Sequence, residues 1–149
     1  MTGITTTLGI MRSDELGMIL PHEHIFAESR RWDAPGYAQA HSNLAAIYAR
    51  KGSFDEAIAE CELALKINPR YPQAYYNLGN FYQEERLFEQ AIAAYQMAIQ
   101  IEPVYLEAHY NLGAAYGNVG KLDKAIFEFQ QVLQLDPGHK AAEVAYRKA

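Results

Sequence analysis

The chain has 149 residues, of which 50% are hydrophobic and 21% are charged, and its formal net charge at pH 7 is −5. This balance fits one folded domain with a real hydrophobic core. The acidic charge argues against binding to nucleic-acid phosphates, which requires clustered lysines and arginines. No apolar run approaches the roughly 18–20 residues that span a bilayer. The single cysteine, Cys61, excludes an intrachain disulfide. We therefore expect a cytoplasmic protein with neither a nucleic-acid nor a membrane partner.

Residues 1–34 are predicted to form a non-repeat N-terminal arm. Within it, residues 5–26 indicate two short extended runs around a turn between Ser13 and Gly17. A Leu-Gly pair and a Glu-Leu-Gly precede a His-x-His here, and over residues 5–28 this order resembles the N-terminus of the phosphotriesterase-like metal-dependent hydrolases. The resemblance implies that His22 and His24 are paired metal ligands on one face of a strand.

The remainder of that hydrolase site has no counterpart in this chain. The family completes its site with a lysine, two histidines and an aspartate from later strands, and its barrel takes roughly 250 residues. Zinc in proteins takes three or four protein ligands. We therefore expect a fusion or remnant, no enzyme and no cofactor, with Zn²⁺ at His22 and His24 only if further ligands exist. An inactive fragment or fusion of a phosphotriesterase-like zinc hydrolase stays open as the alternative.

Residues 38–71, 72–105 and 106–139 repeat one pattern with a step of 34 residues. Such self-similarity at a fixed period is the signature of a repeat architecture. Seven columns hold one residue type in all three rows: Ala40/Ala74/Ala108, Asn43/Asn77/Asn111, Leu44/Leu78/Leu112, Tyr48/Tyr82/Tyr116, Ala57/Ala91/Ala125, Ile58/Ile92/Ile126 and Pro69/Pro103/Pro137.

Each repeat is predicted to hold two amphipathic helices. In the first repeat, the stripe from His41 to Tyr48 has the spacing i, i+3, i+4, i+7, and the stripe from Ala57 to Ala64 follows at i, i+4, i+7. Histidine at position 41, as at position 109, lies on such a stripe, where a hydrogen-bonded core residue is the expected role. A proline near the end of each repeat stops the second helix.

The turn between the two helices is marked by glycine in two of the three repeats. Gly52 and Gly120 can adopt the backbone conformations that end a helix, whereas the middle repeat has Arg86 in their place. Ser53, with Glu56 three residues later, predicts a capping box that opens the second helix of the first repeat.

Small and large residues also alternate in register, as they do where adjacent helices interlock. The small ones are Ala45/Gly79/Gly113 on the first helices, and Ala57/Ala91/Ala125 with Ala64/Ala98/Val132 on the second. The large ones recur beside them as Tyr48/Tyr82/Tyr116 and Cys61/Tyr95/Phe129. On these positions the chain resembles the tetratricopeptide repeat. The resemblance implies an all-α fold over residues 35–149: a right-handed α-solenoid of three helix-turn-helix repeats, with residues 140–149 as a C-terminal capping helix. It also implies a non-catalytic scaffold for protein–protein interaction.

In that family the first helices line a concave groove that binds an extended peptide or a partner helix. Asn43, Asn77 and Asn111 recur once per repeat, and each carboxamide can both donate to and accept from a peptide bond. This ladder resembles the repeat array of O-GlcNAc transferase, although asparagine that merely solvates the helix surface is an equally open interpretation. The candidate groove residues are Asn43, Arg50, Tyr76, Asn77, Asn80, Tyr110, Asn111 and Asn118.

Two further expectations concern partners. One subset of the family clamps the acidic C-terminal tails of chaperones with basic residues and asparagines; the matching positions here are Ser42, Ala46, Asn77, Glu107 and Asn111. Because the basic members are absent, we expect no binding of chaperone tails. A second alternative is a self-associating module, since an uncovered first helix presents an apolar face to another copy.

Overall fold

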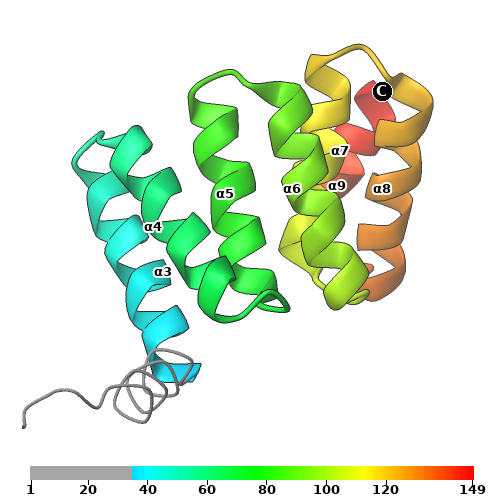
Figure 1. Cartoon of the computed structure of the whole chain (residues 1–149). Helices are drawn as coiled ribbons and strands as arrows, with labels where there is room; N and C mark the ends of the chain where they lie inside the picture. Colours follow the sequence, from blue (N-terminus) through cyan, green and yellow to red (C-terminus); the bar gives the residue numbers. More distant parts are fainter. Residues whose placement is uncertain (1–34) are drawn as a thin grey trace, which may run out of the picture. The chain divides into compact units, whose positions relative to one another are not determined.

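The computed structural model describes residues 35–149, which form helices joined by short turns. Seven helices follow one another within this range (Figure 1): α3 (Pro35–Arg50), α4 (Phe54–Ile67), α5 (Pro72–Glu84), α6 (Phe88–Ile101), α7 (Leu106–Asn118), α8 (Leu122–Leu135) and α9 (Lys140–Lys148). The N-terminal arm, with His22 and His24 and the predicted hairpin, lies outside the described residues.

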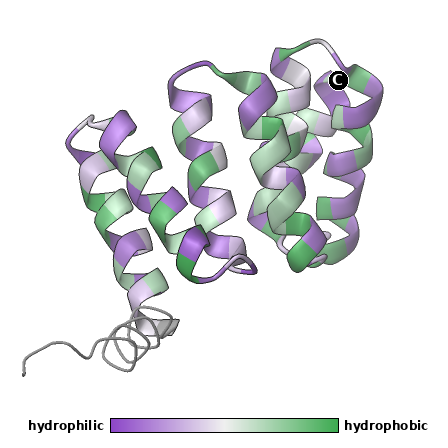
Figure 2. Cartoon of the chain, viewed as in Figure 1, coloured by the Kyte–Doolittle hydropathy of each residue, from purple (hydrophilic) through white to green (hydrophobic). Residues whose placement is uncertain are grey.

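The helices pack as three consecutive hairpins followed by a single helix. The most extensive contacts are within the pairs α3/α4, α5/α6 and α7/α8, and α9 packs on α8. Hydrophilic and hydrophobic residues alternate around each helix (Figure 2), so each helix has an apolar side for its neighbours. The predicted fold, an all-α solenoid of three repeats with a C-terminal cap, is confirmed.

The turn inside each hairpin has one residue with a positive φ, at the same position of every repeat. Gly52 has φ of 81° and Gly120 has φ of 76°, as expected for glycines that end a helix. Arg86 occupies the equivalent position with φ of 63°, so the middle turn keeps its geometry without glycine. A side chain in this region of backbone space costs about 1–2 kcal/mol.

The capping box predicted at Ser53 and Glu56 is wrong. Ser53 does occupy the N-cap of α4, but its side chain makes no capping hydrogen bond. With ψ of 74°, Ser53 lies outside the extended conformation that directs an N-cap hydroxyl at the first turn. Its backbone carbonyl accepts from the amide of Ala57 instead.

Close helix contacts occur where the sequence pairs a small residue with a large one. A Cβ atom on Gly79 would overlap the ring of Tyr95, and one on Gly113 would come within 2.7 Å of Phe129. In the first repeat the smaller Cys61 is buried in the same cluster as Ala45. Burial raises the pKa of the Cys61 thiol to about 12, so the thiol stays protonated at neutral pH and is a poor nucleophile.

Histidines on the packing stripes are hydrogen-bonded, as expected. The Nδ1 atom of His41 lies 2.6 Å from the carboxylate of Glu60, and Nδ1 of His109 lies 2.7 Å from that of Glu128. Each pair joins the first helix of a repeat to its second. The middle repeat carries Tyr75 at the equivalent of the histidines.

Two features are absent from residues 35–149. No helix between residues 35 and 149 is long and apolar enough to cross a membrane. Within the same range, no three histidine, cysteine, aspartate or glutamate side chains come together in a group that could hold a metal ion.

Candidate functional site

The predicted groove residues lie on the first helix of each repeat, and the asparagine ladder differs along its length. Asn43 on α3 is exposed, whereas Asn77 on α5 and Asn111 on α7 are partly buried. The two buried members bond across to the preceding repeat. The ladder therefore joins the repeats as well as presenting amides to solvent.

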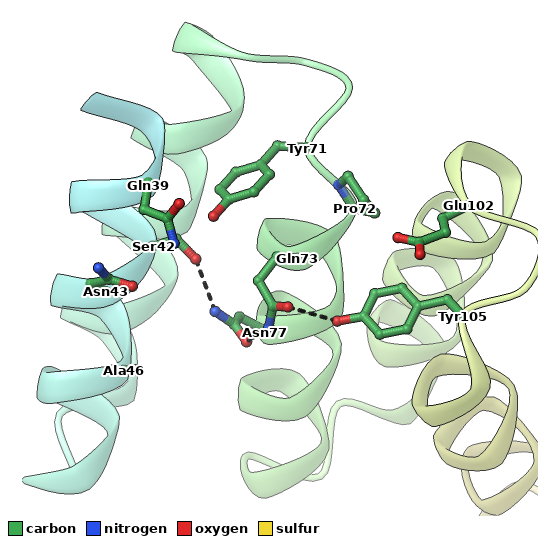
Figure 3. A pocket seen from close by; sticks show the side chains of 10 residues that line it. All are labelled: Gln39, Ser42, Asn43, Ala46, Tyr71, Pro72, Gln73, Asn77, Glu102 and Tyr105. Atoms are coloured by element: carbon green, nitrogen blue, oxygen red, sulfur yellow. Dashed lines mark hydrogen bonds between the residues drawn. The ribbon is translucent and has the colours of Figure 1, made fainter. Parts of the chain in front are cut away.

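A pocket of about 570 Å³ lies between α3, α5 and the loop that precedes α7 (Figure 3). Its walls carry amides, hydroxyls and aromatic rings, together with one carboxylate and no basic group. Ten residues line it: Gln39, Ser42, Asn43, Ala46, Tyr71, Pro72, Gln73, Asn77, Glu102 and Tyr105.

A chain of side-chain hydrogen bonds crosses this pocket. Asn77 donates from Nδ2 to Oγ of buried Ser42 over 3.0 Å, and its Oδ1 accepts from Nε2 of Gln73 over 3.1 Å. The hydroxyl of Tyr105 in turn donates to Oε1 of Gln73 over 2.9 Å. A carboxamide has two N–H donors and two acceptor lone pairs, so Asn77 keeps one of each for a ligand.

Between α5 and α7 the polar side chains form hydrogen bonds with one another. Asn111 donates from Nδ2 to Oδ1 of Asn80 over 2.9 Å and approaches the hydroxyl of Tyr76 at 3.3 Å. The same Asn80 oxygen accepts from the hydroxyl of Tyr95 over 2.8 Å. Burial raises the pKa of Tyr95, so its hydroxyl stays a donor at neutral pH. The Oδ1 atom of Asn80 therefore already accepts two hydrogen bonds from within the protein.

Aromatic rings stack in successive repeats at equivalent positions. Tyr76 lies against Tyr105, with ring centroids 5.1 Å apart and planes inclined by 35°. Tyr110 lies against His139 at 5.2 Å and 36°. Both members of the second pair are 34 residues after those of the first, so the contact repeats with the sequence.

Three candidate residues lie outside both the pocket between α3 and α5 and the hydrogen-bonded cluster of Tyr76, Asn80 and Asn111. Tyr110 borders a second hollow of about 460 Å³ beside α9, which Lys140 and Lys148 flank. Arg50 is exposed near Ile47 and Lys51, and Asn118 is exposed at the end of α7. The structure thus brings Asn43 and Asn77 together in one pocket, and Tyr76, Asn80 and Asn111 in one hydrogen-bonded cluster.

Several pocket residues were missed by sequence reasoning. Gln39 and Gln73 share a column of the repeat, as do Tyr71 and Tyr105 in the loops that precede α5 and α7. The recurrence of glutamine and tyrosine in these columns could have identified the pocket residues from the sequence. The tyrosines escaped notice because they lie just before a helix, outside the stripes that define the groove.

The fold and its polar inner pocket define a helical-repeat solenoid of three helix-turn-helix units. Family models agree: one described as "TPR repeat" matches residues 47–85 and 88–120, and one described as "Tetratricopeptide repeat" matches residues 106–139. The chain belongs to the tetratricopeptide repeat family.

Several solved structures superpose well on the chain. The first TPR of Spaghetti (RPAP3) bound to the HSP90 peptide SRMEEVD has a TM-score of 0.75 at 25% identity, covering 77% of this chain and 91% of that one. The first TPR domain of human RPAP3 gives 0.74 at 26% identity, with the same coverages. MamA gives 0.71 at 28% identity, covering 75% of this chain and 66% of that one. No curated protein matches the sequence.

Proposed function

We propose that this chain is a non-catalytic scaffold that binds an extended peptide in the groove formed by α3, α5 and α7. The observation that carries the proposal is the pocket between α3 and α5, where exposed and half-used amides line a hollow large enough for several groups of a peptide. Asn43 makes no hydrogen bond within residues 35–149, so both halves of its carboxamide are open to a ligand.

The structural relatives support this proposal. The RPAP3 repeat that superposes on this chain was solved with a peptide bound, and its identity to the chain is 25%. Main-chain recognition by amides requires little of the peptide's side chains, so this groove suits an extended segment rather than one rigid surface.

The proposal is tested by selecting a binder from a library of random decapeptides blocked at both ends, and then measuring its affinity for two matched variants. Asn43→Ala removes an exposed groove amide, and Gln100→Ala removes an exposed amide on α6, outside the groove. Loss of one hydrogen bond predicts roughly two- to tenfold weaker binding for Asn43→Ala and no change for Gln100→Ala. Equal losses in the two variants, or no loss in either, would contradict the proposal.

A further inference from the structure

In the pocket between α3 and α5, serine replaces one aromatic ring of a pair that recurs in the later repeats. Tyr76 stacks on Tyr105 and Tyr110 stacks on His139. One step of 34 residues earlier, the corresponding pair is Ser42 and Tyr71. Serine supplies no ring, so in the first repeat the place that a tyrosine fills elsewhere is open.

The hydrogen bond at this position is kept although the ring is absent. Asn77 donates to Oγ of Ser42 over 3.0 Å, much as Asn111 approaches the hydroxyl of Tyr76 at 3.3 Å. The serine therefore holds the repeat junction together while leaving the Tyr71 side chain directed into the space between α3 and α5 (Figure 3).

The chemistry of the open space favours a cation. Of the ten lining residues, Glu102 is the one that carries a charge, and it makes no ion pair within the described range of the chain. The aromatic faces of Tyr71 and Tyr105 attract cations through their ring quadrupole. The remaining walls offer carboxamide oxygens, such as those of Gln39 and Asn43, as acceptors.

Among cations, the planar guanidinium group fits this set best. It stacks on aromatic faces, is weakly hydrated, and presents five N–H donors to acceptors arranged around it. Lysine would offer a point charge on a narrow stem, and would leave the flat space beside Tyr71 unfilled. A carboxylate would meet Glu102 without a compensating cation.

We infer that this pocket receives an arginine side chain of the bound peptide, stacked against Tyr71 and compensated in charge by Glu102. This inference rests on the proposed function, because it names the side chain that the peptide would place between α3 and α5. It also reverses the charge preference that the peptide sequence SRMEEVD of the RPAP3 complex would suggest.

The test uses the full chain and a small probe, N-acetyl-arginine amide, followed by changes in the NMR signals of the Gln39 and Asn43 side-chain amides and the Tyr71 ring. Saturable shifts at millimolar probe are expected. The citrulline analogue has the same shape without the charge, and it should bind at least severalfold more weakly. The lysine analogue should also be weaker.

Two variants test the open space at Ser42 and the charge of Glu102 separately. Ser42→Tyr restores the ring present in the other repeats, retains a hydroxyl for Asn77, and should abolish the shifts. Glu102→Gln should weaken binding roughly two- to fivefold, as expected for a solvent-accessible ion pair. Glu84→Gln, an exposed carboxylate on α5 outside the pocket, is the control and should change nothing.

The inference is overturned if the probe causes no shifts at these residues, if citrulline binds as well as arginine, or if Glu102→Gln and Glu84→Gln behave alike. Library peptides that bind in the groove without any preference for arginine would contradict this inference but would still support the proposed function. Failure of every peptide to perturb the groove would remove both.

Discussion

The imidazole of His109 lies between two acceptors, with Nδ1 at 2.7 Å from Oε2 of Glu128 and Nε2 at 3.0 Å from the carbonyl oxygen of Pro103. Beside an ionised carboxylate, an imidazolium is the form that donates to both. The hydrogen bond to Glu128 raises the pKa of His109 above its ordinary value of 6.5, and burial opposes that shift. This pair joins α7 to α8 in the last repeat.

A pH dependence of stability follows from the raised pKa. Its contribution to the free energy of unfolding is fully present below the unfolded pKa, and it is lost as the pH rises through the higher folded pKa. Wild type should therefore be less stable at a mildly alkaline pH than at pH 6.5. The double variant His109→Tyr with Glu128→Ala, which copies the Tyr75 and Ala94 of the middle repeat, should lose less stability over the same change of pH. Urea denaturation at the two pH values measures the difference; parallel changes in both proteins would contradict the assignment.

Replacing Arg86 with glycine should stabilise the protein. Arg86 adopts φ of 63°, whereas glycine occupies this conformation without steric cost at Gly52 and Gly120. After the greater chain entropy of glycine in the unfolded state is subtracted, we expect Arg86→Gly to raise the free energy of unfolding by roughly 0.5–1 kcal/mol. The readout is the urea midpoint at unchanged slope. The reverse change, Gly120→Arg, should lower the midpoint.

The contact between Gly79 and Tyr95 predicts a change of sign in a double-mutant cycle. Gly79→Ala forces a methyl group against the tyrosine ring and should destabilise by about 1–3 kcal/mol. In a Tyr95→Cys background, which copies the Ala45 and Cys61 of the first repeat, the same change should stabilise by up to about 1 kcal/mol, because alanine favours helix. Chemical denaturation of the four proteins gives the coupling energy. If the effects of Gly79→Ala and Tyr95→Cys were additive, contact with the Tyr95 ring would not restrict the size of the side chain at position 79.

Chaperone-tail binding is predicted to be absent, although a structural relative was solved with a bound HSP90 peptide. Ser42 is buried and bonded to Asn77, and Glu107 places an exposed carboxylate where a basic residue would be needed. The peptide SRMEEVD should therefore show no micromolar binding in a calorimetric titration. Micromolar binding that disappears when the terminal carboxylate is amidated would refute this expectation.

The 34-residue columns predict the fold because several of them, such as Ala57/Ala91/Ala125, are buried packing positions. The columns of small and large residues include Gly79, Gly113, Tyr95 and Phe129, and the structure shows that Gly79 packs on Tyr95 and Gly113 on Phe129. The capping box at Ser53 could not be judged in the same way. It depends on the backbone angles of Ser53, which the turn around Gly52 sets and which the residue types do not reveal.

The candidate site was less predictable than the fold for a physical reason. Its pocket depends on the absence of an aromatic ring at Ser42 and on the direction of the Tyr71 side chain. These two residues belong to separate segments that meet only after the helices pack. Asn77 was correctly placed on the first helix, but its bonds to Ser42 and Gln73 depend on side-chain rotamers that periodicity does not encode.

Peptide binding in the groove is tested most directly by NMR of side-chain amides in the presence of a library-selected peptide. The account predicts that the signals of Asn43, Gln73 and Asn77 shift on titration, while those of exposed amides on the second helices, such as Gln100 and Gln134, stay in place. Shifts confined to Gln100 and Gln134, with Asn43, Gln73 and Asn77 unmoved, would show that the peptide binds elsewhere and would contradict the account.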